Sequence, residues 1–112
     1  MLNDCVNVHN RKAPKYAEIF KLAAELAERD IPFKFEYIKC GDLKQCYLWY
    51  FDGQQLPATV TQGNASYGFD DGLLEITGLL YPEEAEKSED GSLGWLTAGN
   101  VLERILKKEA ER

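Results

Sequence analysis

The sequence predicts a single α+β domain over residues 1–112, with helices on one face of a short three-stranded antiparallel sheet. Apolar residues recur at helical spacing near both ends of the chain, and the runs between them have the alternation and the β-branched and aromatic content of strands. The expected elements are a helix at 14–30, strands near 33–39, 46–51 and 54–62, a short helix at 72–80 and a helix at 97–111.

The first helix is indicated by an apolar stripe between Pro14 and Asp30. Proline suits the first turn of a helix, where its missing N–H costs nothing. Pro32 predicts the end, because the residue before a proline is disfavoured in helical geometry. Residues 1–12 are polar and are expected to be flexible.

The first two strands carry many aromatic residues. Phe33, Phe35 and Tyr37 alternate with polar residues and so share one face. Asp52-Gly53, between two apolar runs, predicts a hairpin turn. Pro57 cannot donate a ladder hydrogen bond, which favours an edge position for the third strand.

The second strand is apolar on both faces. Tyr47, Trp49 and Phe51 fall on one face, and Leu48 and Tyr50 on the other. One face is expected to pack on the first helix. The sequence leaves open whether the C-terminal helix or another protein covers the other face, since exposed aromatic patches are typical of interfaces.

The segment at 72–80 is expected to be a short helix closed by Gly78, although Ile76 and Thr77 leave a strand open. Residues 82–93 read as an acidic loop with a helical turn near its start.

The C-terminal helix has clearer signals. Thr97 is a natural N-cap, and Lys107 and Lys108 complement the dipole in the late turns.

The net charge of −6 is concentrated in one part of the chain. Residues 70–90 hold eight of the 19 acidic residues and only one of the 13 basic ones. A local acidic field repels nucleic-acid backbones and attracts basic surfaces. A protein partner with a basic surface is therefore favoured over nucleic acid.

The chain is expected to be cytoplasmic. No apolar run approaches the roughly 20 residues that span a bilayer, and the first residues lack the apolar core of a secretory signal. Cys5, Cys40 and Cys46 are odd in number and form no CxxC pair, which favours reduced thiols over disulfides or a zinc site.

The stretch "GNASYGFD" from Gly63 has the Gly-x-x-x-x-Gly spacing of a phosphate-binding loop. Such a loop ends in a lysine and a hydroxyl residue, but Phe69 and Asp70 stand at these places and Asp71 follows. Two carboxylates would repel a triphosphate, and the spacing of an EF-hand calcium loop is absent too. We therefore expect no cofactor, no metal and no catalytic residue, and an enzyme is disfavoured.

Four pieces of the C-terminal half occur in a fixed order: Ser66-Tyr67-Gly68, Leu73-Leu74-Glu75-Ile76, Gly78-Leu79-Leu80 and Gly94-Trp95-Leu96-Thr97-Ala98. In this order they resemble small uncharacterised proteins from phages and prophages of Gram-positive (Firmicute) bacteria. The resemblance covers about 40 of the 112 residues and brings no catalytic residue with it. It implies a phage accessory protein that acts in the cytoplasm of a bacterial host.

We therefore expect a non-enzymatic accessory protein that binds a host or phage protein through its acidic, Gly- and aromatic-rich segment. The expected partner-binding residues are acidic or aromatic: Tyr67, Phe69, Asp70, Asp71, Glu83, Glu84, Glu86 and Trp95. Two alternatives stay open. The Gly63–Gly72 loop would cradle a small molecule or serve a hydrolytic reaction, or the aromatic sheet face would form a homodimer.

Overall fold

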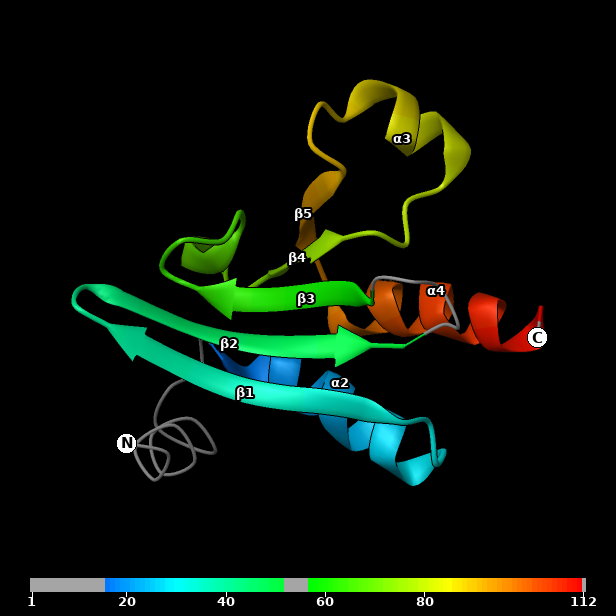
Figure 1. The fold of residues 1–112 in the computed structure, drawn as a ribbon, viewed down its shortest axis with the longest axis horizontal. Helices are drawn as coiled ribbons and strands as arrows, with labels where there is room; N and C mark the ends of the chain where they lie inside the picture. Colours follow the sequence, from blue (N-terminus) through cyan, green and yellow to red (C-terminus); the bar gives the residue numbers. More distant parts are fainter. Residues whose placement is uncertain (1–15, 52–56, 112) are drawn as a thin grey trace.

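A computed structural model describes residues 16–51 and 57–111. They form a five-stranded antiparallel sheet in chain order, β1-β2-β3-β4-β5, with the two longer helices behind it (Figure 1). The elements are α2 (Ala17–Glu28), β1 (Phe33–Cys40), β2 (Leu43–Tyr50), β3 (Ala58–Gly63), the 3-10 helix η2 (Phe69–Asp71), β4 (Leu74–Thr77), α3 (Pro82–Lys87), β5 (Ser92–Leu96) and α4 (Ala98–Ala110). The α+β class is confirmed, whereas the predicted count of three strands is wrong. No helix in these ranges has the length and apolar character needed to cross a membrane.

Helix α2 lies within the predicted range of 14–30 and buries Ile19, Leu22 and Leu26 completely. It ends in a Schellman motif, in which the N–H of Asp30 binds the carbonyl of Ala27 and the N–H of Ile31 that of Leu26. Asp30 takes the left-handed conformation that this motif requires, with φ of 57°. The chain therefore turns directly from the helix into β1.

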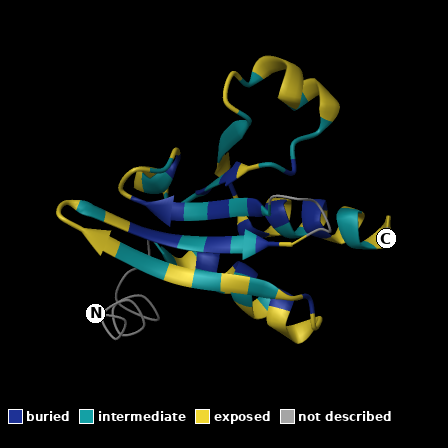
Figure 2. Cartoon of the chain, in the orientation of Figure 1, coloured by how far each residue is buried: buried dark blue, intermediate teal, exposed yellow. Residues whose placement is uncertain are grey.

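Strands β1 and β2 show which side of the sheet is buried. Phe35 packs on Phe20 of α2 with 5.1 Å between ring centroids, so the predicted shared face of β1 looks toward the helices. Leu48 and Tyr50 of β2 lie fully buried on the same side. The opposite side carries Tyr47, which is half-buried, and Figure 2 shows this alternation along β2.

Strand β3 corrects the prediction of an edge strand. It lies between β2 and β4, and Val60 pairs with Leu48 on one side and with Ile76 on the other. Pro57 does not disturb this position because it precedes the first paired residue, Ala58. The predicted turn at Asp52-Gly53 and the predicted flexible start at 1–12 lie outside the described residues.

The predicted helix at 72–80 is wrong, because this segment forms β4. Leu74 and Ile76 are fully buried, while Glu75 and Thr77 alternate with them. This period of two, together with the edge of β3 next to the segment, favours a strand. A helix confined between Gly72 and Gly78 would have fewer than two turns, which is too short to be stable.

The expected acidic loop at 82–93 contains more structure than a turn. Its first part is the helix α3, and its last residues begin β5, which pairs with β4. Strand β5 was not predicted, since it is short and is interrupted by Gly94 and by Trp95 at φ of 60°. Helix α3 projects beyond the sheet from the ends of β4 and β5 that it joins (Figure 1).

Helix α4 begins at the predicted N-cap. The Thr97 hydroxyl accepts a hydrogen bond from the N–H of Asn100 at 3.1 Å, and Val101 and Ile105 enter the core beside α2. Both Lys107 and Lys108 lie in the last turn, as predicted.

Candidate functional site

One hollow brings together five of the eight predicted partner-binding residues. It has a volume of about 340 Å³ and is named here the Tyr67–Trp95 hollow. Its lining comes from the segment between β3 and β4 and from β5: Asn64, Ser66, Tyr67, Gly68, Phe69, Asp70, Asp71 and Trp95.

The loop that carries the hollow is tied to the β1–β2 hairpin. The Asn64 carboxamide oxygen accepts a hydrogen bond from the N–H of Lys44 at 3.0 Å, and the N–H of Ala65 donates to the Gln45 side chain at 3.0 Å. The Ser66 hydroxyl closes the turn by binding both the N–H and the carbonyl of Gly63. These bonds fasten the loop to the hairpin and close its turn.

These bonds use most of the loop's backbone donors. At least eight of the ten N–H groups from Gly63 to Gly72 donate within the protein: those of Gly63, Asn64, Ala65, Ser66, Tyr67, Phe69, Asp71 and Gly72. A backbone cradle for phosphate needs such groups to point outward at the ligand. The loop geometry therefore gives little support to a small-molecule site made of backbone N–H groups.

The most exposed rings of the site form a stacked pair. Tyr67 is 54% exposed and Trp95 57% exposed, and their ring planes differ by 10° with centroids 5.9 Å apart. Gly94 makes this possible, because a Cβ there would lie 2.3 Å from the Tyr67 Cβ. Gly68 has φ of 92°, and a Cβ there would lie 2.9 Å from the Trp95 backbone nitrogen. Two glycines thus set the spacing of the two segments.

Carboxylates hold the pair in place and give the hollow its charge. Asp71 accepts a hydrogen bond from the Trp95 indole N–H at 3.2 Å, and Glu75 accepts one from the Tyr67 N–H at 2.7 Å. Asp70 and Asp71 are both exposed. Among the described residues that line the hollow none is basic, so its charge is negative.

Phe69 has a different role from the stacked pair. Its ring is half-buried and lies 5.5 Å from that of Tyr16, which in turn meets Tyr37 edge-on at 6.4 Å. Phe69 therefore lines the hollow and, through Tyr16, links this lining to the start of α2 and to β1.

The other three predicted residues lie elsewhere. Glu83, Glu84 and Glu86 are on α3, which joins the end of β4 to the start of β5, whereas the hollow lies at the opposite ends of these two strands (Figure 1). The structure does not bring these three residues to the hollow.

Glu84 is engaged within the protein. Its two oxygens accept hydrogen bonds from the Arg104 guanidinium at 2.6 and 2.8 Å, and the same side chain caps α3 by binding the Tyr81 N–H. The bond to Arg104 lowers the pKa of Glu84 from 4.5 to about 2, against the opposing effect of burial. Arg104 also donates a hydrogen bond to the Leu79 carbonyl. The Glu84–Arg104 ion pair therefore fastens α3, and Arg104 the segment before it, to α4.

The sequence identified Trp95 as a candidate binding residue but did not predict that it lies beside Tyr67. Without β5 there was no reason to place it beside Tyr67. Gly94, directly before the tryptophan, was the available signal, since a glycine inside a strand pattern often marks the close approach of another backbone.

Within residues 16–51 and 57–111 no three His, Cys, Asp or Glu side chains gather closely enough to hold an ion. Cys40 is exposed and Cys46 is buried, and neither is in a disulfide.

The chain matches no protein-family model, no curated protein and no solved structure.

Proposed function

We propose that this protein is a non-enzymatic binding module whose Tyr67–Trp95 hollow receives a cationic side chain from the surface of a partner protein. The observation that carries the proposal is the joint presence, in one hollow, of two exposed stacked rings and two exposed carboxylates. The hollow lies at the lower end of the size range of ligand pockets, which is room enough for a single side chain.

The chemistry of this lining favours arginine over other side chains. A guanidinium is planar, stacks on the faces of tyrosine and tryptophan, and binds carboxylates through paired N–H donors. Tyr67 and Trp95 offer the faces, and Asp70 and Asp71 offer the acceptors. Lysine would use the same site as a point charge, with fewer hydrogen bonds.

The two kinds of residue make different contributions to binding. Exposed tyrosine and tryptophan at the centre of an interface supply much of its affinity. Surface carboxylates mainly speed the encounter with a basic partner and select against acidic ones. Glu83 and Glu86 on α3 are exposed and extend the acidic field without lining the hollow.

The alternatives have less support. A backbone cradle for a small molecule has few donors left in the Gly63–Gly72 loop. Self-assembly through the open sheet face is weakened because Lys34 lies over the Trp49 ring at 5.4 Å, and Tyr47 already stacks on that ring at 5.6 Å.

The biological setting follows from the resemblance to small phage and prophage proteins. In that setting the partner is a host or phage protein with a basic surface, met in the cytoplasm of a Gram-positive bacterium.

Affinity capture from such a host's lysate tests the proposal with two variants of equal charge. Asp70→Asn/Asp71→Asn alters the hollow, and Glu83→Gln/Glu86→Gln alters α3 by the same charge. The expected result is a stoichiometric protein that the wild type and the α3 variant retain, that the hollow variant loses, and that salt releases. Equal loss in both variants, or no loss in either, would reject the hollow as the binding site.

A further inference from the structure

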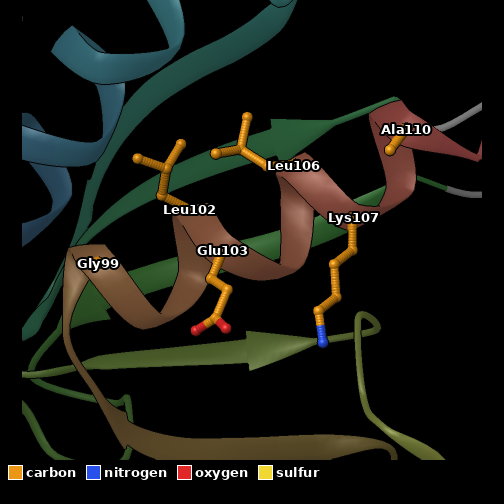
Figure 3. A pocket seen from close by; sticks show the side chains of 6 residues that line it. All are labelled: Gly99, Leu102, Glu103, Leu106, Lys107 and Ala110. Atoms are coloured by element: carbon orange, nitrogen blue, oxygen red, sulfur yellow. The ribbon is translucent and has the colours of Figure 1, made fainter.

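A second hollow runs along the outer face of α4 and shares no residue with the Tyr67–Trp95 hollow. It measures about 390 Å³, and six residues line it: Gly99, Leu102, Glu103, Leu106, Lys107 and Ala110 (Figure 3). These positions recur every three or four residues, so they form one stripe along the whole helix, named here the outer stripe.

The outer stripe lies beside the stripe that α4 buries in the core. Ala98, Val101 and Ile105 are buried against the rest of the domain. On the outer stripe Leu106 is 37% exposed, and Leu102 is half-buried and packs in part against the core. Helix α4 therefore leaves apolar surface of these two leucines outside the core.

The outer stripe has two unlike flanks. In Figure 3 the side chains of Leu102 and Leu106 project to one side of the helix, and those of Glu103 and Lys107 project to the other. One flank is apolar, and the other carries one charge of each sign. The small residues Gly99 and Ala110 stand at its two ends.

We propose that the outer stripe binds the outer stripe of a second copy of this chain, with the two α4 helices antiparallel. The two-fold axis lies between the two helices, in the plane of the interface and perpendicular to both, level with the midpoint of residues 104 and 105. Rotation about it reverses the direction of the second helix. It also keeps the apolar flank of the second helix on the same side as the apolar flank of the first, and the charged flanks together on the other side. The contact is isologous, as in most homodimers.

This symmetry brings together residues that suit one another. Leu102 meets Leu106 of the second copy, and Glu103 meets Lys107 of the second copy, each pair occurring twice. Gly99 faces Ala110 of the second copy, and these small side chains let the helix ends approach. A parallel arrangement would instead place the leucines of one copy on the charges of the other. Charge complementarity therefore selects an antiparallel second copy as the occupant.

The interface is small, which determines how the dimer behaves. Helix α4 has 13 residues and is about 20 Å long, so a single helix pair buries less than a standard interface. The chain is therefore expected to be a monomer when dilute and to dimerise reversibly when concentrated. A dimer would also present two Tyr67–Trp95 hollows and so strengthen binding to a partner with repeated basic sites.

Sedimentation velocity from micromolar to near-millimolar concentration tests the proposal. The wild type is expected to dimerise, and Leu106→Glu is expected to abolish the dimer. Glu103→Lys and Lys107→Glu each put like charges opposite one another twice, so each alone should dimerise about tenfold more weakly. Lys107 also lies over the Tyr81 ring at 4.7 Å, so thermal unfolding must show that each variant keeps its fold.

The decisive sample is an equimolar mixture of Glu103→Lys and Lys107→Glu. In the mixed dimer both charge pairs are restored, so the mixture should associate more strongly than either variant alone. Glu86→Lys, which changes the charge on α3 as Glu103→Lys does on α4, should dimerise like the wild type. A wild type that stays monomeric throughout, or a mixture that associates no better than its components, would overturn the proposal.

Discussion

The rings of Tyr67 and Trp95 stack at 5.9 Å although they belong to different segments, one before β4 and one in β5. The Asp71 carboxylate accepts a hydrogen bond from the Trp95 indole N–H, and the Glu75 carboxylate accepts one from the backbone N–H of Tyr67. Because these residues share contacts, a change at one is expected to be felt by the others. The hollow is therefore expected to behave as one unit.

Gly94→Ala should separate the two rings. Its new Cβ would lie 2.3 Å from the Tyr67 Cβ, which forces Tyr67 away and costs about 1–3 kcal/mol of unfolding free energy. The Trp95 indole N–H resonance should shift, assigned by comparison with Trp95→Phe. Gly99→Ala is the matched control, because its Cβ would meet nothing closer than 3.8 Å. Unchanged stability and an unmoved indole resonance in Gly94→Ala would contradict the stacked arrangement.

Trp95→Gly should be more stable than Trp95→Ala by about 1 kcal/mol. Trp95 has φ of 60°, where a Cβ is crowded and glycine is not. Trp95 is largely exposed, so little core packing is lost in either variant. Urea unfolding of the two variants measures the difference, and an equal or higher stability of Trp95→Ala would show that the strain is absent.

Glu84→Gln should destabilise the protein near neutral pH by about 1–2 kcal/mol, a value reduced for the partial exposure of the pair. In the folded protein the pKa of Glu84 is about 2, below its ordinary 4.5, so its charge stabilises the fold above about pH 4.5. This contribution is lost as pH falls from 4.5 toward 2. The gap in stability between wild type and variant should therefore close over that range.

Urea unfolding at several pH values between these limits checks the prediction for Glu84. Glu83→Gln is the control, since Glu83 lies on the same helix but is exposed. A gap that stays constant with pH would mean that the charge of Glu84 does not act through Arg104.

Glu18→Ala should cost about 1 kcal/mol, and Glu18→Gln less. The Glu18 carboxylate in α2 accepts a hydrogen bond from the N–H of Ala98 at 2.6 Å, and Ala98 is the first residue of α4. Glu18 thus caps the N-terminus of α4, a helix that is far from it in the sequence. Negative charge is favourable at a helix N-terminus because of the helix dipole. Thermal unfolding measures the loss, with the exposed Glu28→Ala as control. An equal effect of Glu18→Ala and Glu28→Ala would exclude the cap.

The sequence predicted those elements whose signals are local. The apolar stripe of α2, the Thr97 cap of α4 and the alternation at Phe33, Phe35 and Tyr37 all depend on neighbouring residues. The sequence did not predict the features that depend on which strands pair with one another. The 72–80 segment becomes β4 because β3 offers it an edge, and Pro57 sits in front of a central strand rather than at an edge.

The candidate site was predicted in the same uneven way. Tyr67, Phe69, Asp70 and Asp71 adjoin in sequence, so their grouping was visible there. The place of Trp95 beside them depends on β5, and the pairing of Glu84 with Arg104 depends on the fold of α3 against α4. Such tertiary contacts leave no periodic signal in the chain.

The most direct test of the proposed site is a titration of the isotope-labelled protein with a short arginine-rich peptide, followed by NMR. The peptide supplies the guanidinium groups that the hollow is proposed to bind, and two-dimensional spectra report each residue separately. We predict that the largest shifts occur at Tyr67, Asp70, Asp71 and the Trp95 indole N–H, and that Asp70→Asn/Asp71→Asn removes them. Shifts centred on Glu83 and Glu86 of α3 instead, or no saturable shift at all, would contradict the Tyr67–Trp95 hollow as a cation-binding site.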